Sequence, residues 1–137
     1  MADRDDQPTI LVVEDEQALI ELYVRWLDHE YTVLTAGGGE EALETFDSEV
    51  DVVLLDRLMP GMSGDEVLGE IRSRASTCKV AMVTAVEPDF DVITMGFDDY
   101  LTKPVEREEL LDTIQRLLSR SQFDEIEQEL YALSSKQ

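Results

Sequence analysis

The sequence predicts an α/β fold in which a parallel sheet is covered by helices on both faces. Short apolar runs alternate with segments whose apolar residues recur at the three- to four-residue spacing of a helix face. The alternation repeats five times, and strands separated by helices pair in parallel through right-handed crossovers. The 137 residues amount to one domain, and the 43% hydrophobic content is typical of a globular protein.

The first part of the chain contains three predicted strands and two predicted helices. The apolar run at residues 9–13 predicts a strand, and so does the alternating run at 31–36. Residues 51–56 (DVVLLD) are the most apolar run, which predicts a central strand. A helix is predicted over residues 15–30, and a shorter one over 40–46 follows three consecutive glycines.

The remainder continues the same alternation. A third helix follows the Pro- and Gly-containing loop at residues 57–64, and strands are predicted at 79–85 and 98–102. A fourth helix is expected over residues 88–96, because proline suits a first turn and glycine suits a helix end. A long fifth helix starts at Val105.

The charge of the chain narrows the classes of partner. There are 32 acidic and 11 basic residues, for a net charge of −21. Such a chain repels the nucleic acid backbone and anionic lipid, so we expect no direct nucleic acid binding and no membrane contact. Molar salt shortens the screening length to about 3 Å, which makes this self-repulsion tolerable and suggests a halophilic source. An acidic mesophilic protein is the alternative.

Other features predict a cytoplasmic protein. Cys78 is the single cysteine, so no intrachain disulfide can form. The polar start of the chain does not resemble a signal peptide, and no run approaches the roughly 18 apolar residues of a membrane span.

Polar side chains stand where the predicted strands end. Glu14 and Asp15 follow the first strand, Asp56 ends the third, Thr84 lies at the end of the fourth, and Lys103 follows the fifth. Each alone is explained by turn or helix-start preferences. In an open parallel sheet, however, all of these ends face one crevice, so together they predict a functional site.

The chemistry of that site follows from its groups. Three crowded carboxylates repel one another and need a cation, and Mg²⁺ prefers such oxygen ligands. Carboxylates also accept phosphoryl groups, and Asp56 occupies the tip of the central strand. Mg²⁺, the Lys103 ammonium and the Thr84 hydroxyl could neutralise the charge of a phosphoryl group in transit. Asp56 is therefore the predicted nucleophile.

At this point the chain resembles the receiver domain of two-component response regulators. The matching segments are ED at 14–15, LLDRLMPGMSG at 54–64, VTA at 83–85 and GFDDYLTKP at 96–104. The resemblance covers about residues 8–120. It implies a flavodoxin-like, doubly wound (βα)5 three-layer sandwich with the parallel sheet order 2-1-3-4-5.

The resemblance also implies roles for individual residues. Asp56 would accept a phosphoryl group from a histidine kinase, and Lys103 would pair with the phosphate. Asp15, Asp56 and the main-chain carbonyl of Leu58 would bind Mg²⁺, with Glu14 acting through a bound water. The protein would be a phosphoacceptor that assists its own phosphorylation and dephosphorylation, and not a conventional enzyme.

A conformational switch is implied as well. Thr84 would move toward the phosphoryl oxygens, and Tyr100 would swing inward behind it. That movement would change the face made by the fourth helix, fifth strand and fifth helix, and so control a downstream output, expected to be transcriptional. The Lys103–Pro104 bond is expected to be cis. A homodimer would use this face or the C-terminal helix.

Three positions flanking the phosphate bear on its lifetime. Ala85 is small and leaves room for the phosphodonor. Leu58 and Val86 are apolar, so neither can orient an attacking water. We therefore expect slow self-dephosphorylation.

Residues 121–137 form a predicted C-terminal helical extension. Its apolar stripe points away from the stripe of the preceding helix, so either the helix restarts near Ser121, where Asp124 completes a capping box, or the second stripe binds a partner. A solvated tail that carries a few apolar residues is the alternative. The segment FDEIEQELYALSSK at 123–136 resembles the beginning of the HalX domain that follows receivers in halophilic archaea.

Several alternatives fit the sequence less well. An aspartyl-phosphate phosphatase or mutase would need an acid at position 58, where this chain has leucine. A nucleotide-binding module would need glycines after the first strand, and the lone His29 sits at a helix end, which disfavours a histidine phosphotransfer role. A phosphate-independent partner-binding module stays open. The acidic residues near the fourth helix lack basic neighbours in the sequence, so a charge-paired dimer is not assumed. These residues are Asp89, Asp91, Asp98 and Asp99.

Overall fold

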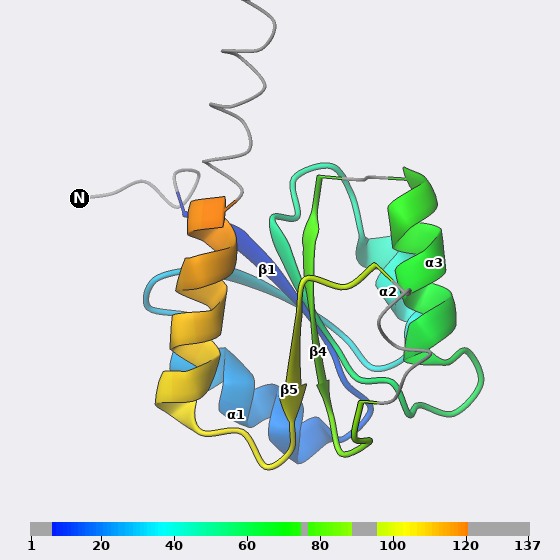
Figure 1. Cartoon of the computed structure of the whole chain (residues 1–137), viewed down its shortest axis with the longest axis horizontal. Coiled ribbons are helices and arrows are strands. Elements are labelled where there is room, and N and C mark those ends of the chain that lie inside the picture. Colours follow the sequence, from blue (N-terminus) through cyan, green and yellow to red (C-terminus); the bar gives the residue numbers. More distant parts are fainter. Residues whose placement is uncertain (1–6, 75–76, 89–95, 121–137) are drawn as a thin grey trace, which may run out of the picture.

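The computed structural model describes residues 7–74, 77–88 and 96–120, and confirms the predicted fold (Figure 1). Its centre is a five-stranded parallel sheet in the order β2-β1-β3-β4-β5. The strands are β1 (Thr9–Val13), β2 (Thr32–Ala36), β3 (Val52–Leu55), β4 (Lys79–Thr84) and β5 (Asp99–Thr102).

Helices cover both faces of this sheet. α1 and the last described helix, residues 107–120, lie on one face, while α2 and α3 lie on the other (Figure 1). The predicted fourth helix at 88–96 falls mostly outside the described residues. Gly96 is described and has a φ of +87°, a conformation that glycine adopts freely. The three labelled helices are α1 (Gln17–Leu27), α2 (Gly39–Thr45) and α3 (Gly64–Arg74).

Successive side chains along each strand point to opposite faces of the sheet, so the protein has two hydrophobic cores, one on each face. Odd-numbered β1 and β3 residues, such as Leu11 and Val53, pack with α2 and α3. Even-numbered residues, such as Val12 and Leu54, pack against α1 and helix 107–120. All four β3 residues are buried, as expected for the central strand of a sheet covered on both faces.

The register of the sheet brings the strand ends to one edge. Val13 pairs with Ala36 on one side and Leu55 on the other, and Thr84 pairs with Thr102. The chain leaves β1 toward β2 on one side and reaches β3 on the other, so the topological switch point lies between β1 and β3. Residues that follow these two strands therefore stand at the site that the topology favours for ligands.

None of the described helices combines the length and the apolar character that a bilayer span requires.

Candidate functional site

Three carboxylates meet at the carboxyl ends of β1 and β3. One oxygen from each of Glu14, Asp15 and Asp56 lies within 4.8 Å of the other two. Glu14 and Asp56 are 2% and 5% exposed, whereas Asp15 is exposed. An all-oxygen donor set that is open to water on one side fits Mg²⁺, which keeps several waters when bound. These are three of the residues predicted to hold the metal.

Lys103 bridges two of these carboxylates. Its Nζ lies 2.5 Å from Glu14 Oε1 and 3.0 Å from Asp56 Oδ2. The Lys103 amide donates to the Thr84 carbonyl oxygen at 2.8 Å, and the Lys103–Pro104 peptide bond is cis. Part of the negative charge is therefore balanced by the chain itself, which the sequence-based argument for a compensating cation did not include.

Burial and pairing act on the ionisation of this cluster. Burial, reinforced by Asp56, raises the pKa of Glu14, against the opposing hydrogen bonds from Lys103 and the Glu16 amide. Burial acts to lower the pKa of Lys103, but its bonds to Glu14 and Asp56 outweigh that effect and the pKa is raised. Lys103 thus remains a cation at neutral pH.

The backbone around Asp56 is held closely. The Asp56 amide donates to the Val13 carbonyl oxygen at 3.1 Å, and Asp56 Oδ1 accepts from the Leu58 amide at 3.2 Å. Gly64, the first residue of α3, passes so near that a Cβ there would lie 2.1 Å from the Asp56 carbonyl oxygen. A glycine is required at this position because of that close approach.

Thr84 and Tyr100 both bond to Val86, and neither has a hydrogen bond to the three carboxylates of the cluster among the described residues. Thr84 is fully buried, and its Oγ1 accepts from the Val86 amide at 3.4 Å. Tyr100 is half-buried; its hydroxyl donates to the Val86 carbonyl oxygen at 2.5 Å, and its ring packs edge-on against Phe97 at 5.5 Å. Both residues therefore meet the loop that follows β4, and their role as a switch stays a prediction.

Among the described residues, Leu58 is the one large apolar side chain that is exposed, with 64% of its surface accessible to solvent. Ala85 is exposed and Val86 is half-buried on the opposite loop. The positions predicted to flank a phosphate thus belong to loops that follow β3 and β4. The expected slow dephosphorylation, and the metal contact of the Leu58 carbonyl, stay predictions.

Arg57 and Asp65 are two functional candidates that the sequence did not reveal. Arg57 pairs with Asp65 through two parallel bonds, Nε to Oδ1 at 3.0 Å and Nη2 to Oδ2 at 3.1 Å. Arg57 Nη1 also donates to the Tyr100 hydroxyl at 3.3 Å. The bond to Asp65, followed by that to Tyr100, raises the pKa of Arg57. Nothing in the spacing of these residues indicates that they meet.

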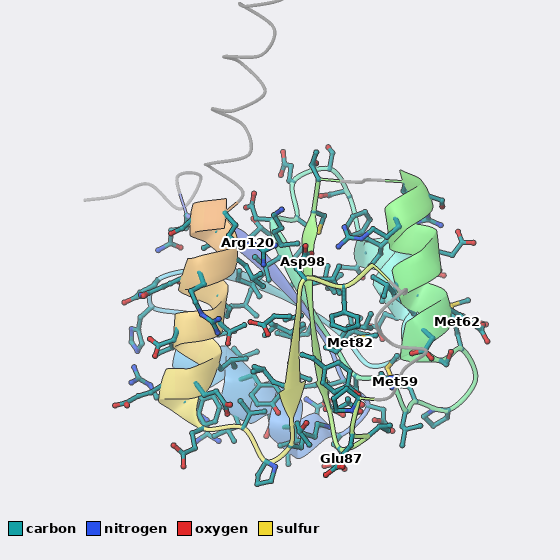
Figure 2. The ribbon with its side chains drawn as sticks, in the orientation of Figure 1. Met59, Met62, Met82, Glu87, Asp98 and Arg120 are labelled. Atoms are coloured by element: carbon teal, nitrogen blue, oxygen red, sulfur yellow. The ribbon has the colours of Figure 1, made fainter. Side chains whose placement is uncertain are left out.

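The view that Asp98 and Asp99 lack basic neighbours is wrong. Asp98 pairs with Arg72 of α3 at 2.7 Å, and Asp99 pairs with Arg116 at 3.3 Å. Arg120 also donates to the Asp98 main-chain oxygen at 3.3 Å (Figure 2). These partners are distant in sequence and are brought near by the fold. Asp89 and Asp91 lie outside the described residues.

Comparison with known proteins agrees with this geometry. Residues 10–115 match the family described as the response regulator receiver domain. A putative transcriptional regulator of Haloferax volcanii is 51% identical over 133 residues, covering 96% of this chain and 23% of that protein. The sensory transduction protein RegX3 of Mycobacterium bovis is 40% identical over 126 residues, covering 87% of this chain and 54% of RegX3. The chain thus spans about half or less of these relatives.

Solved structures of the same fold are also similar. A CheY-like receiver domain protein from Methanospirillum hungatei superimposes with a TM-score of 0.81 at 27% identity, covering 87% of this chain and 99% of that one. The response regulator TrrA of Thermotoga maritima, solved in complex with Mg²⁺ and BeF, has a TM-score of 0.75 at 39% identity, covering 82% and 100%. The Haloferax relative agrees with the expectation of a halophilic archaeal regulator. By sequence, fold and the arrangement of its strand ends, the chain belongs to the response regulator receiver domain family.

Proposed function

We propose that this chain is a phosphoacceptor, and that Asp56 receives a phosphoryl group from the phosphohistidine of a histidine kinase in a Mg²⁺-dependent step. The observation that supports this most strongly is the cluster of three carboxylate oxygens within 4.8 Å, with the Lys103 ammonium bonded to two of the three residues. Among carboxylates of the described residues, Asp56 alone combines a buried position at the central strand tip with membership of this cluster.

Different residues of the chain would attack, hold the nucleophile and stabilise charge during phosphoryl transfer. An Asp56 carboxylate oxygen attacks phosphorus, the P–O bond forms, and the P–N bond to the histidine breaks. The Leu58 amide and Lys103 hold the Asp56 carboxylate in place before the attack. Charge then spreads over the three equatorial phosphoryl oxygens. The Lys103 ammonium gives up its hydrogen bond to Asp56 and donates to one of these oxygens, and the Thr84 hydroxyl donates to another.

Asp15, Asp56 and the main-chain carbonyl of Leu58 are the groups that would hold Mg²⁺, with Glu14 acting through a bound water. When bound, the ion supplies positive charge that screens the carboxylates from the incoming phosphoryl oxygens. The TrrA structure with Mg²⁺ and BeF supports this assignment for a relative that is 39% identical.

Signalling would follow from the loop after β4. Thr84 and Tyr100 both bond to Val86, so a movement of Thr84 toward the phosphoryl group would release or rearrange Tyr100. The β5 face and helix 107–120 would change, and a homodimer through this face or the C-terminal helix is a further part of the proposal. We place the receiver at residues 8–120 and assign residues 121–137 to a HalX-like extension.

The whole protein would act in the cytoplasm, and its output would be transcriptional. The description of the Haloferax volcanii relative as a putative transcriptional regulator supports this output, and the match to only 23% of that protein leaves length for an effector region there.

The test is phosphorylation by acetyl phosphate in the presence of Mg²⁺, followed by intact-protein mass spectrometry. Wild type should gain one phosphoryl group, and Asp56→Asn should gain none. Asp51→Asn is the matched control, because Asp51 precedes the same strand at its other end, where its carboxylate accepts a bond from the Thr9 amide. Equal labelling of wild type and Asp56→Asn, or none in either, would contradict the proposal; the latter would favour a phosphate-independent binding module.

A further inference from the structure

We infer that Arg57 is a positioning residue for Tyr100, and that Asp65 sets the direction in which Arg57 donates. The inference rests on the proposed function only in treating Tyr100 as the switch. It concerns a chain of hydrogen bonds that begins at the first turn of α3 and ends at the loop after β4.

The geometry of this chain is directional. Asp65 accepts two bonds from the Nε and Nη2 edge of Arg57, at 3.0 and 3.1 Å. A planar guanidinium held at that edge has its Nη1 aimed in a fixed direction. Nη1 donates to the Tyr100 hydroxyl at 3.3 Å, and that hydroxyl donates onward to the Val86 carbonyl oxygen at 2.5 Å.

Arg57 is suited to this task by its burial. Its side chain is 13% exposed, while that of Asp65 is 42% exposed. An ion pair so open to water at one end adds little to stability. The bidentate contact instead restricts the rotamers of Arg57, which would otherwise be numerous, so its value lies in orientation.

The position of Arg57 links the phosphoacceptor to the aromatic ring. Arg57 is the residue directly after Asp56, and its main-chain oxygen accepts from the Gly64 amide at 2.9 Å. A displacement of the Asp56 backbone is therefore passed to the guanidinium and on to Tyr100. Arg57 stabilises the arrangement in which Tyr100 reaches Val86, and so biases the equilibrium between ring positions.

The hydrogen bond from Arg57 to the Tyr100 hydroxyl sets the size of the preference for the Val86-bonded ring position. A hydrogen bond from a charged donor changes the ratio of two ring positions by about tenfold, so removing it should depopulate the Val86-bonded position to that extent. Tyr100 would then sample positions away from Val86, and its resonance would become an average over them.

The test is ¹⁹F NMR of protein in which the four tyrosines are replaced by 3-fluorotyrosine, with the Tyr100 resonance assigned from Tyr100→Phe. Arg57→Gln should shift the Tyr100 resonance, and Asp65→Asn should shift it less, because Arg57 remains present but less constrained. The resonances of Tyr23 and Tyr31 should not move. Asp65→Asn also keeps the experiment decisive if Arg57→Gln folds poorly, since Asp65 is the more exposed partner.

The matched control is Glu70→Gln. Like Asp65, Glu70 is an α3 carboxylate that pairs with an arginine, but its partner is the exposed Arg74, at 3.9 Å. It should leave Tyr100 unchanged. Repeating the series in Asp56→Asn separates this inference from the proposed function, because that variant cannot accept a phosphoryl group. A Tyr100 resonance unmoved by both Arg57→Gln and Asp65→Asn, or moved equally by Glu70→Gln, would overturn the inference.

Discussion

Replacement of Gly64 by alanine should damage the site although it leaves every polar side chain of the site in the sequence unchanged. The added Cβ would lie 2.1 Å from the Asp56 carbonyl oxygen and 2.7 Å from Arg57 Cα, whereas ordinary contacts begin near 3.4 Å. The first contact is thus about 1.3 Å too short. Because both neighbours are backbone atoms, no side-chain rotation can relieve the overlap, so α3 and the Asp56 backbone must move apart.

The expected loss has two parts. Overpacking of this kind destabilises a protein by about 1–3 kcal/mol, and a purely backbone clash belongs at the upper end of that range. A displacement of about 1 Å at a reacting group can also slow a reaction by about 100-fold. We therefore expect Gly64→Ala to lower the free energy of unfolding by about 3 kcal/mol and to slow acetyl phosphate labelling by roughly 10- to 100-fold.

Gly69→Ala is the matched control, since Gly69 lies in the same helix and a Cβ there would meet nothing within 4 Å. That variant should be more stable by about 0.5–1 kcal/mol, because alanine favours the helix, and should label at the wild-type rate. Urea denaturation and labelling time courses measure both quantities. If Gly64→Ala matched Gly69→Ala in both, the close approach of α3 to Asp56 would not be what requires a glycine.

Three other predictions concern different parts of the chain. Arg72→Met should lower the free energy of unfolding by about 2–3 kcal/mol in urea melts, because Arg72 donates to the Gly96 carbonyl oxygen and pairs with Asp98; an unchanged midpoint would contradict this. Burial raises the pKa of Cys78 to about 12, so iodoacetamide should label native protein at pH 8 far more slowly than urea-unfolded protein, and equal rates would show the thiol to be accessible. Lys103→Met leaves the raised pKa of Glu14 without its main opposing partner. Since an acid with a raised pKa favours folding only while protonated, stability of this variant relative to wild type should fall as pH rises above about 4.5, and a flat difference between pH 4.5 and 7 would contradict the pairing.

The parts of the fold set by local pattern were predictable from the sequence. Strand β3 was predicted at 51–56 and observed at Val52–Leu55, because a continuous apolar run flanked by polar residues leaves little freedom in its placement. Helix α1 was predicted over 15–30 and is shorter, Gln17–Leu27, since helix ends are decided by individual backbone bonds and not by the apolar stripe.

Contacts between distant residues were predictable only where the topology fixed them. Asp56 and Lys103 were expected to meet because both follow parallel strands, and their atoms lie 3.0 Å apart. The second bond of Lys103, to Glu14, depends on side-chain reach that no strand pattern encodes. The bond between Arg57 and Tyr100 joins residues 43 positions apart from a loop and a strand, and it depends on the orientation of one guanidinium group.

The acidic cluster itself can be tested by calorimetric titration of Mg²⁺ into wild type, Asp15→Asn and Glu16→Gln. Molar KCl should be present throughout, so that the net charge of −21 is screened and only a specific site is seen. Asp15 and Glu16 are adjacent and both exposed, but only Asp15 contributes to the cluster. One Mg²⁺ should bind to wild type and to Glu16→Gln alike, and Asp15→Asn should bind it at least about tenfold more weakly. Equal affinity in all three proteins would contradict the claim that these strand ends form a magnesium site.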